Sequence, residues 1–211
     1  MIRTTFRTVR WFRQRAGELL ATRACLVAIL FAMATVPARA EDAVVEVRET
    51  QGVYDVTGRF EAAVPLATAW AVLSDYEHID KFVKSMRASA FVRRPDGSRV
   101  LRQDAVVGVF LFHHAIRVEL ALHEEPRKRI AFRDELGKDF SQYSGSWTLH
   151  TDSTGTRVDY ALHADPRAGI PRTLGRGVMA HSAKALLTQV RQEMIRRAGV
   201  TRALADSAAP R

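Results

Sequence analysis

The stretch VPLATAWAVLSDYEHIDKFV, residues 64–83, decides which fold the sequence predicts. It reads as about two turns of helix, the tripeptide Ser74-Asp75-Tyr76, and a second short apolar piece that ends at Val83. Pro65 suits the first position of a helix, where its missing N–H costs little. Helical fragments this short rarely stand between strand-like segments unless they cover something. We therefore expect the pair to cover the mouth or floor of an internal cavity.

Strand-like segments lie on both sides of this helical pair. Apolar and polar residues alternate over residues 43–64, which indicates one or two strands. Further segments follow at residues 86–93, 99–109, 110–124, 129–136, 141–151 and 157–165, and short turns such as Pro95–Ser98 separate them. The sequence therefore predicts six to seven antiparallel strands, with the two short helices after the first strand.

A long amphipathic helix is predicted at the end of the chain. Apolar residues recur every three to four positions from residue 174 to residue 198, and Gly199 is the expected stop. Small residues such as Ala180 and Ala183 leave space beneath this helix. A sheet followed by one long helix is an α+β layout. We expect the sheet to curve around the helix, and residues 201–211 to form a flexible tail.

The first forty residues resemble a targeting signal rather than part of the fold. Arginines precede the apolar run of residues 24–36, and the triplet Ala38-Arg39-Ala40 follows it. The run has 13 residues, whereas a membrane-spanning helix needs about 20. A secretory signal peptide over residues 1–40 is the prediction, with an uncleaved anchor as the alternative. The domain would then occupy residues 41–200, in the periplasm or outside the cell.

Removal of this segment changes the charge of the chain. It holds 7 of the 32 basic and 1 of the 23 acidic residues, so the remaining chain carries 25 minus 22, or +3. A nucleic-acid partner therefore loses its main support. The only cysteine, Cys25, is removed as well, so no disulfide is expected. The basic run Arg127–Arg129, with Arg191, Arg196 and Arg197, is either a solvated surface or a transient contact for an anionic membrane.

An ordered set of residues carries a resemblance to a known family. The set is Pro65, Trp70, Leu73, Ser74-Asp75-Tyr76, Phe82-Val83, Gly137-x-Asp139-Phe140, Gly145-x-Trp147, Gly155-Thr156-x-Val158-x-Tyr160, Pro166 and Pro171, with the terminal helix. Together they resemble the START-like helix-grip (SRPBCC) superfamily, in its polyketide cyclase/dehydrase and coenzyme Q-binding branch, over nearly all of residues 53–198. The resemblance implies a cavity for apolar small molecules such as lipids, isoprenoid quinones or polyaromatic compounds.

Strand alternation predicts which side chains face this cavity. Even positions of residues 110–124 are apolar apart from His114, which is either a core histidine with a partner or a ligand contact. Asp134 is also placed inward, where it would pair with an arginine, cap the short helices or touch a ligand. The candidate ligand-binding residues are Trp70, Gln103, Phe112, His114, Ile116, Phe132, Asp134, Tyr143, Trp147, Tyr160, Met179, Ala183 and Leu187.

The sequence leaves three functions open. The first is an exported binding or transfer protein for an apolar small molecule, which the apolar inner face favours. The second is a cyclase or dehydratase whose acid–base groups would be His114, Asp134, Tyr143 and Tyr160. The third is a module that presents its outer sheet face to a partner. No motif for a metal or a cofactor is present, and Gly175–Ala180 fits G-x-G-x-x-A only outside the βαβ unit that a dinucleotide site needs.

We predict that the exported chain begins at Glu41, because Ala38-Arg39-Ala40 places the cleavage site directly before it. The intact mass of protein isolated from the cell envelope measures this start. A chain that keeps Met1 and stays in the membrane would show an anchor instead.

Overall fold

The computed structural model describes residues 43–109, 112–167 and 172–208, all within one compact unit, Ala40–Arg211. The predicted signal peptide lies outside the described residues, and so do Phe110 and Pro171. The account below concerns the described residues.

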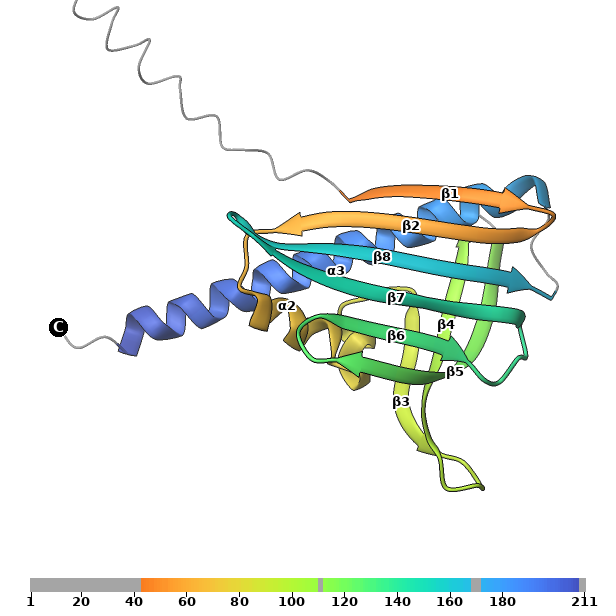
Figure 1. The fold of residues 1–211 in the computed structure, drawn as a ribbon, viewed down its shortest axis with the longest axis horizontal. Helices are drawn as coiled ribbons and strands as arrows, with labels where there is room; N and C mark the ends of the chain where they lie inside the picture. Colours follow the sequence, from red (N-terminus) through yellow and green to blue (C-terminus); the bar gives the residue numbers. More distant parts are fainter. Residues whose placement is uncertain (1–42, 110–111, 168–171, 209–211) are drawn as a thin grey trace, which may run out of the picture. The chain divides into compact units, whose positions relative to one another are not determined.

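Eight antiparallel strands form one strongly curved sheet (Figure 1). They are β1 (Val44–Thr50), β2 (Val53–Ala62), β3 (Met86–Arg93), β4 (Arg99–Val109), β5 (Phe112–Glu125), β6 (Arg129–Asp134), β7 (Phe140–Asp152) and β8 (Gly155–Pro166). Their order in the sheet is β1-β2-β8-β7-β6-β5-β4-β3. The expected six to seven strands become eight, because β1 and β2 form a hairpin whose turn residues, Gln51 and Gly52, both have positive φ.

The two short helices follow β2, so they come after the second strand rather than the first. They are α2 (Leu66–Leu73) and the 3-10 helix η1 (Tyr76–Lys81), and together they are called the cover below. The carbonyl of Pro65 accepts the first backbone bonds of α2, at 2.9 Å from the nitrogen of Thr68 and 3.1 Å from that of Ala69. Ala69 and Val72 are the buried residues of α2. The spacing of apolar residues thus turns one side of α2 towards the core.

The C-terminal helix α3 runs from Arg172 to Ala208 and is longer than predicted. It continues through Gly199, which has no positive φ and therefore does not form the left-handed cap that would stop a helix. Among the described residues, no helix combines the length and the apolar character needed to cross a bilayer.

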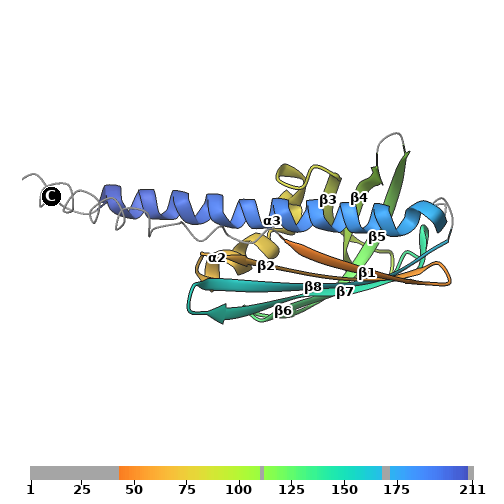
Figure 2. The ribbon, with the colours of Figure 1, turned by 90° about the horizontal axis from the view of Figure 1, so that it is seen from above.

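Helix α3 lies along the inner face of the sheet (Figures 1 and 2). Its backbone comes close to β1 and β2 at one edge of the sheet and to β4 towards the other, with few or no close approaches to β5–β8 between them. Helix α2 packs against α3 and against β7 and β8. The inner faces of the central strands are therefore occupied by side chains rather than by helix backbone.

Two glycines let α3 approach β2 closely. A Cβ at Gly58 of β2 would collide with a methyl group of Leu187, and a Cβ at Gly175 of α3 would collide with the phenol of Tyr54. Both Leu187 and Tyr54 are fully buried. Gly175 opens the predicted G-x-G-x-x-A pattern, and its role in the structure is close packing.

We predict that Gly175→Ala lowers the free energy of unfolding by about 1–3 kcal/mol, because the added methyl overpacks the contact with Tyr54. Gly177→Ala is the matched control, since a Cβ there meets nothing within 4 Å. It should raise stability by up to about 1 kcal/mol through helix propensity alone. Urea unfolding midpoints measure both, and equal effects at the two positions would contradict the packing argument.

Candidate ligand-binding site

Five aromatic side chains gather on the inner face of β6, β7 and β8. They are Phe132, Phe140, Tyr143, Trp147 and Tyr160, called the inner aromatic group below. The sheet register sets Trp147 opposite Tyr160, and their ring centroids are 4.5 Å apart. Tyr143 lies 4.7 Å from Phe140 and 6.0 Å from Phe132 between centroids. These separations fall within the range of favourable aromatic pairs, so the group forms an aromatic wall of two clusters, Trp147 with Tyr160 and Tyr143 with Phe140 and Phe132.

Phe140 is the member of this group that the sequence did not propose as a ligand contact. Counting alternation back from Tyr143 places residue 140 on the outer face. A register shift between Phe140 and Gln142 turns Phe140 inward, and it is buried there. A bulge of this kind leaves no clear signal in a two-residue pattern.

The phenol hydroxyls of Tyr143 and Tyr160 have no hydrogen-bond partner among the described residues. Neither hydroxyl is among the described side-chain atoms that are both sealed from water and without a partner. The same holds for the indole N–H of Trp147. Buried polar groups nearly always find partners. The site therefore presents three donors that the protein itself leaves unused.

Burial raises the pKa of both phenols. The pKa of Tyr143 rises to about 12, first through burial and then through the charge of Asp134. The pKa of Tyr160 lies well above its usual value, again through burial first and then through Tyr143. Both side chains are consequently neutral hydrogen-bond donors at physiological pH.

Most of the other predicted residues lie on the same inner face. Ile116, Trp70, Met179 and Ala183 belong to the core or pack against it. Gln103 pairs with buried Val118 in the register and donates to the hydroxyl of Ser89 at 3.2 Å. Apolar and polar residues alternate only weakly on β4, so the sequence alone did not settle which way Gln103 points.

Two further candidates, Phe112 and His114, lie at the start of β5. His114 is half-buried and makes no hydrogen bond or ion pair with any residue that the structure describes. The core interpretation of His114 requires such a partner, and none lies among the described residues. The side chain of Phe112 lies outside the described part of the chain.

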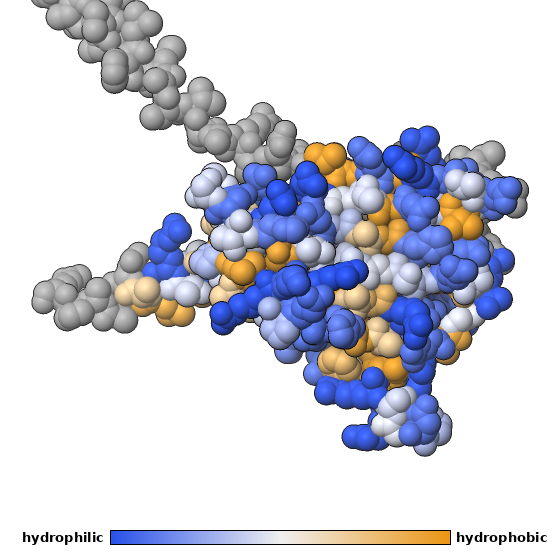
Figure 3. Space-filling view, viewed as in Figure 1, coloured by the Kyte–Doolittle hydropathy of each residue, from blue (hydrophilic) through white to orange (hydrophobic). Residues whose placement is uncertain are grey.

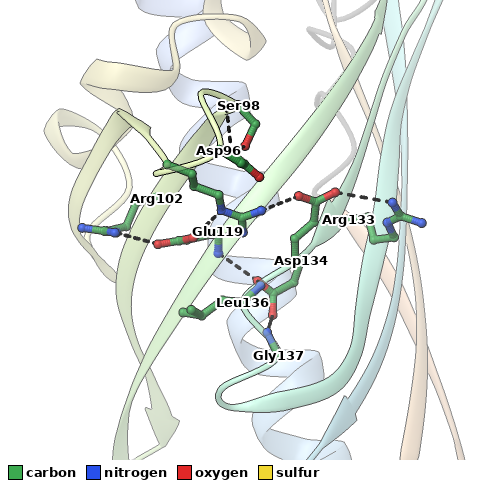
Figure 4. A network of polar contacts seen from close by, with 10 residues as sticks. Asp96, Ser98, Arg102, Glu119, Arg133, Asp134, Leu136 and Gly137 are labelled. Carbon is green, nitrogen blue, oxygen red and sulfur yellow. Dashed lines mark hydrogen bonds and ion pairs between the residues drawn. The ribbon is translucent and has the colours of Figure 1, made fainter.

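Asp134 requires a correction, because its carboxylate serves the backbone (Figure 4). It accepts N–H groups from Glu119 at 2.8 Å, Leu136 at 3.1 Å and Gly137 at 3.0 Å. From the sequence, we expected Asp134 to pair with an arginine, to cap the short helices or to touch a ligand. The structure shows instead that Asp134 holds the turn after β6 against β5. With three of its acceptor positions filled, it is assigned to the scaffold.

Leu187 requires a second correction. Its exposed fraction is 0%, so it touches neither solvent nor any internal space large enough for water. It packs on β2 at Gly58 instead. Leu187 therefore belongs to the core and does not line the site.

A buried carboxylate, Glu119, links the edge of the sheet to its neighbours, and the sequence analysis did not identify it. Glu119 lies on the outer face of β5, where alternation predicts exposure, yet only 6% of it is exposed. It accepts hydrogen bonds from Arg102 and Arg94, which lower the pKa of Glu119 (Figure 4). Arg94 also bonds to Glu135. The network ties the tip of the β3–β4 hairpin to β5 and to the turn after β6.

The tripeptide that follows α2 anchors the cover on two sides. The Ser74 hydroxyl donates to the carbonyl of Trp70 at 2.9 Å. Asp75 binds Arg197 of α3 at 2.7 Å, and the Tyr76 hydroxyl donates to Glu124 of β5 at 2.7 Å. Burial opposes ionisation of Asp75, but bonds from His78 and Arg197 keep its pKa below the usual value. The cover is thus held to both the helix and the sheet.

Glu193 orients the arginine that reaches the cover. Its side chain is buried in α3 and accepts bonds from Arg196 and Arg197, which lower its pKa to about 2 against the opposing effect of burial. From the sequence, Arg196 and Arg197 were predicted to lie on a solvated surface or at a membrane contact. Their pairing spans one helical turn, but the contact of Arg197 with Asp75 is set only by the fold.

The outer face of the sheet carries two open hollows. Their volumes are about 580 Å³ and about 430 Å³, and Thr57, Ser146 and Ala161 line both. In Figure 3, which shows the molecule in the orientation of Figure 1, hydrophilic and pale residues cover most of the surface and hydrophobic ones form separate patches. Tyr160 contributes to the lining of the larger hollow and Phe132 to that of the smaller one, so both hollows adjoin the strands that carry the inner aromatic group.

The curved sheet, the long helix and the inner aromatic wall define a helix-grip protein. The chain matches the family described as polyketide cyclase / dehydrase and lipid transport over residues 54–199. It belongs to this family. A search of curated protein sequences gives no match.

Solved structures share the fold at low sequence identity. A STAR-related lipid transfer protein from Xanthomonas axonopodis is 20% identical with a TM-score of 0.56, covering 74% of this chain and 94% of its own. The Zhui aromatase/cyclase from Streptomyces sp. R1128 is 19% identical with a TM-score of 0.58, covering 69% and 95%. Human STARD10 is 13% identical with a TM-score of 0.57, covering 74% and 70%. The same architecture thus occurs in proteins named for lipid transfer and for cyclisation.

We predict that Glu193→Gln lowers the free energy of unfolding at neutral pH by about 1–3 kcal/mol, because two arginines lose their charged acceptor. A lowered pKa stabilises the fold above the pKa of an unfolded glutamate, about 4.3, and this contribution is lost as the pH falls through about 2. The gap between variant and wild type should therefore close over this range.

Urea titrations at several pH values measure that gap. Glu77→Gln, at an exposed position on η1, is the control and should show no gap at any pH. If the difference in unfolding free energy between wild type and Glu193→Gln stays constant down to pH 2, ionised Glu193 is not its cause.

Proposed function

We propose that this protein is an exported carrier that binds a neutral, largely apolar small molecule with hydrogen-bond acceptors. The observation that supports this most directly is the pair of unpartnered hydroxyls, Tyr143 and Tyr160, set in an aromatic wall. Sites for small molecules are mostly apolar with a few convergent polar groups. A ligand with carbonyl oxygens would satisfy both hydroxyls.

The charge of the wall supports a neutral ligand. Asp134 is the carboxylate whose charge raises the pKa of Tyr143, and three backbone N–H groups hold it in place. The two phenols stay protonated. An ionised head group placed beside this wall would meet no opposite charge from the inner aromatic group. Burial of an unpaired charge costs far more than burial of a carbonyl group.

Binding fits these side chains better than proton transfer does. A general base works best with a pKa near the operating pH, whereas the pKa values of Tyr143 and Tyr160 are raised away from it. Asp134 is committed to the backbone. A cyclase would have to use the phenols as hydrogen-bond donors to a carbonyl and would have only His114 left as an acid–base group among these candidates.

The class of ligand follows from the wall and from the family. Lipid transport and polyketide chemistry both appear in the family description. Among such molecules, isoprenoid quinones and polyaromatic ketones combine a flat apolar body with carbonyl acceptors. We place them ahead of charged lipids, and the signal-like segment supports export to the periplasm.

We predict that Tyr160→Phe weakens binding of naphthoquinone between about twofold and tenfold, the effect of one lost hydrogen bond. Naphthalene is the matched probe, because it keeps the flat rings and lacks the carbonyls. Its affinity should not change in the variant. Quenching of tryptophan emission measures both affinities. Equal loss for both probes would show a packing defect and overturn the role of the hydroxyl.

Ala183→Trp separates an internal site from surface binding. Ala183 is buried on the side of α3 that packs against the sheet, and a tryptophan there would fill space beneath the helix. Binding of both probes should be lost while the protein stays folded by circular dichroism. Unchanged naphthoquinone binding in a folded Ala183→Trp protein would place the ligand elsewhere. Turnover of candidate polyketides by the wild type would favour the enzyme instead.

A further inference from the structure

Strand β1 is one of the two outer strands of the sheet and lies along its upper border in Figure 1. A tight turn joins it to β2, so Thr50 forms a hydrogen-bonded pair with the first residue of β2. Every second residue back from Thr50 also turns its backbone towards β2. The N–H and C=O groups of Val45, Val47 and Glu49 therefore point away from the sheet, and no backbone group among the described residues bonds to them.

The backbone of β1 is open to a further strand. Natural proteins usually protect an outer strand with a bulge, proline or lysine. Strand β1 contains no proline or lysine, and all seven of its residues pair with β2 without a shift of register. The other outer strand, β3, differs, because its register with β4 shifts between Met86 and Ala88. Such a bulge disrupts the ladder, so β1 is the better template for pairing.

Two charges of opposite sign stand on the outer face of β1. Glu46 and Arg48 are exposed, and neither forms an ion pair with any residue that the structure describes. Asp55 lies opposite Arg48 on β2, but it is bound to His163 at 2.8 Å. Exposed charges on an outer strand oppose pairing unless the incoming strand carries the opposite charge at each position.

A second copy of β1 meets this condition when two antiparallel strands are centred on Val47. The free backbone groups belong to every second residue, so the register can change only by steps that keep Val45, Val47 and Glu49 opposite one another. Centred on Val47, Glu46 of each copy lies opposite Arg48 of the other. One step in either direction sets Glu46 against Glu46 or Arg48 against Arg48, and like charges directly opposite each other are destabilising.

We propose that two copies of this chain join through β1 into one continuous sheet, with a two-fold axis at Val47. In this arrangement Val44, which is 56% exposed, lies opposite Thr50 of the second copy, and such β-branched side chains suit a sheet. The same surface is used by both copies, so the assembly closes at two. The contact is narrow, so the dimer should dissociate on dilution. It does not depend on the inner aromatic group.

Reversal of one charge tests the cross-strand pairs in the chain from Glu41 onward, which contains the whole described unit. Sedimentation velocity should show wild type passing from one chain to two as its concentration rises. Arg48→Glu should raise the dissociation constant about 30-fold, because two attractive pairs become repulsive. Glu46→Arg/Arg48→Glu exchanges the charges and should restore the constant to within about threefold. Arg87→Glu, the same change at an exposed position of β3, should behave like wild type.

Cysteine pairing tests the register. The chain from Glu41 onward contains no cysteine, so Glu46→Cys and Arg48→Cys each introduce a single thiol. Opposite residues in this register have Cα atoms about 4.5 Å apart, within the range that a disulfide spans. A mixture of the two variants should therefore form linked dimers under mild oxidation, whereas either variant alone should remain mostly unlinked. Gel electrophoresis without reductant measures both.

Four outcomes would overturn the proposal. Wild type that stays a single chain at its highest soluble concentration would exclude the dimer. A mass above two chains would indicate open joining of β1 to β3 instead. Equal weakening by Arg48→Glu and Arg87→Glu, without rescue in the exchanged variant, would reduce the effect to net charge. Linking of either cysteine variant alone, as strong as in the mixture, would exclude the register centred on Val47.

Discussion

The contact between Leu187 of α3 and Gly58 of β2 is the constraint on which the rest of the fold depends. The glycine removes the Cβ that would block the leucine, so the helix comes down onto the backbone of β2. The same helix also reaches β4, far along the sheet order. A sheet that meets one straight helix at both β2 and β4 has to curl between them. The curl carries the inner faces of β6 and β7 away from the helix, and the inner aromatic group fills that side.

Three buried or hydrogen-bonded carboxylates and the two phenols of the inner aromatic group have different tasks. Asp134, Glu119 and Glu193 each accept several hydrogen bonds and hold turns, hairpins or arginines in place. Their interactions are satisfied inside the protein, so they add rigidity without offering a ligand anything. Tyr143 and Tyr160 do the opposite, since their hydroxyls have no partner in the described part of the chain. Unpaired donors in such a wall gain most from a ligand that brings acceptors.

Alternation along the strands was enough to predict the inward direction of Phe132, Tyr143, Trp147 and Tyr160, because a two-residue period is fixed by strand geometry. It failed for Phe140, where a bulge changes the period, and for Glu119, which arginines from other strands bury. It also gave no access to the bond between Asp134 and the N–H of Glu119 or to the pair of Arg197 with Asp75, because these partners lie on other elements and only the folded chain brings them together. The end of α3 was misplaced because Gly199 permits a left-handed stop without requiring one.

The cover and α3 are held in place by contacts of different kinds. The cover buries Ala69 and Val72 in the core and is also held by polar links, chiefly Arg197 with Asp75 and Tyr76 with Glu124, at sites that water still reaches. Ion pairs in such places contribute about 0.2–1 kcal/mol each. Lifting α3 would instead expose Leu187, and removing a buried leucine from its packing costs about 2–5 kcal/mol. The tripeptide Ser74-Asp75-Tyr76 therefore adds polar fastenings to the apolar packing of the cover, while Leu187 and Gly58 hold α3 on the sheet.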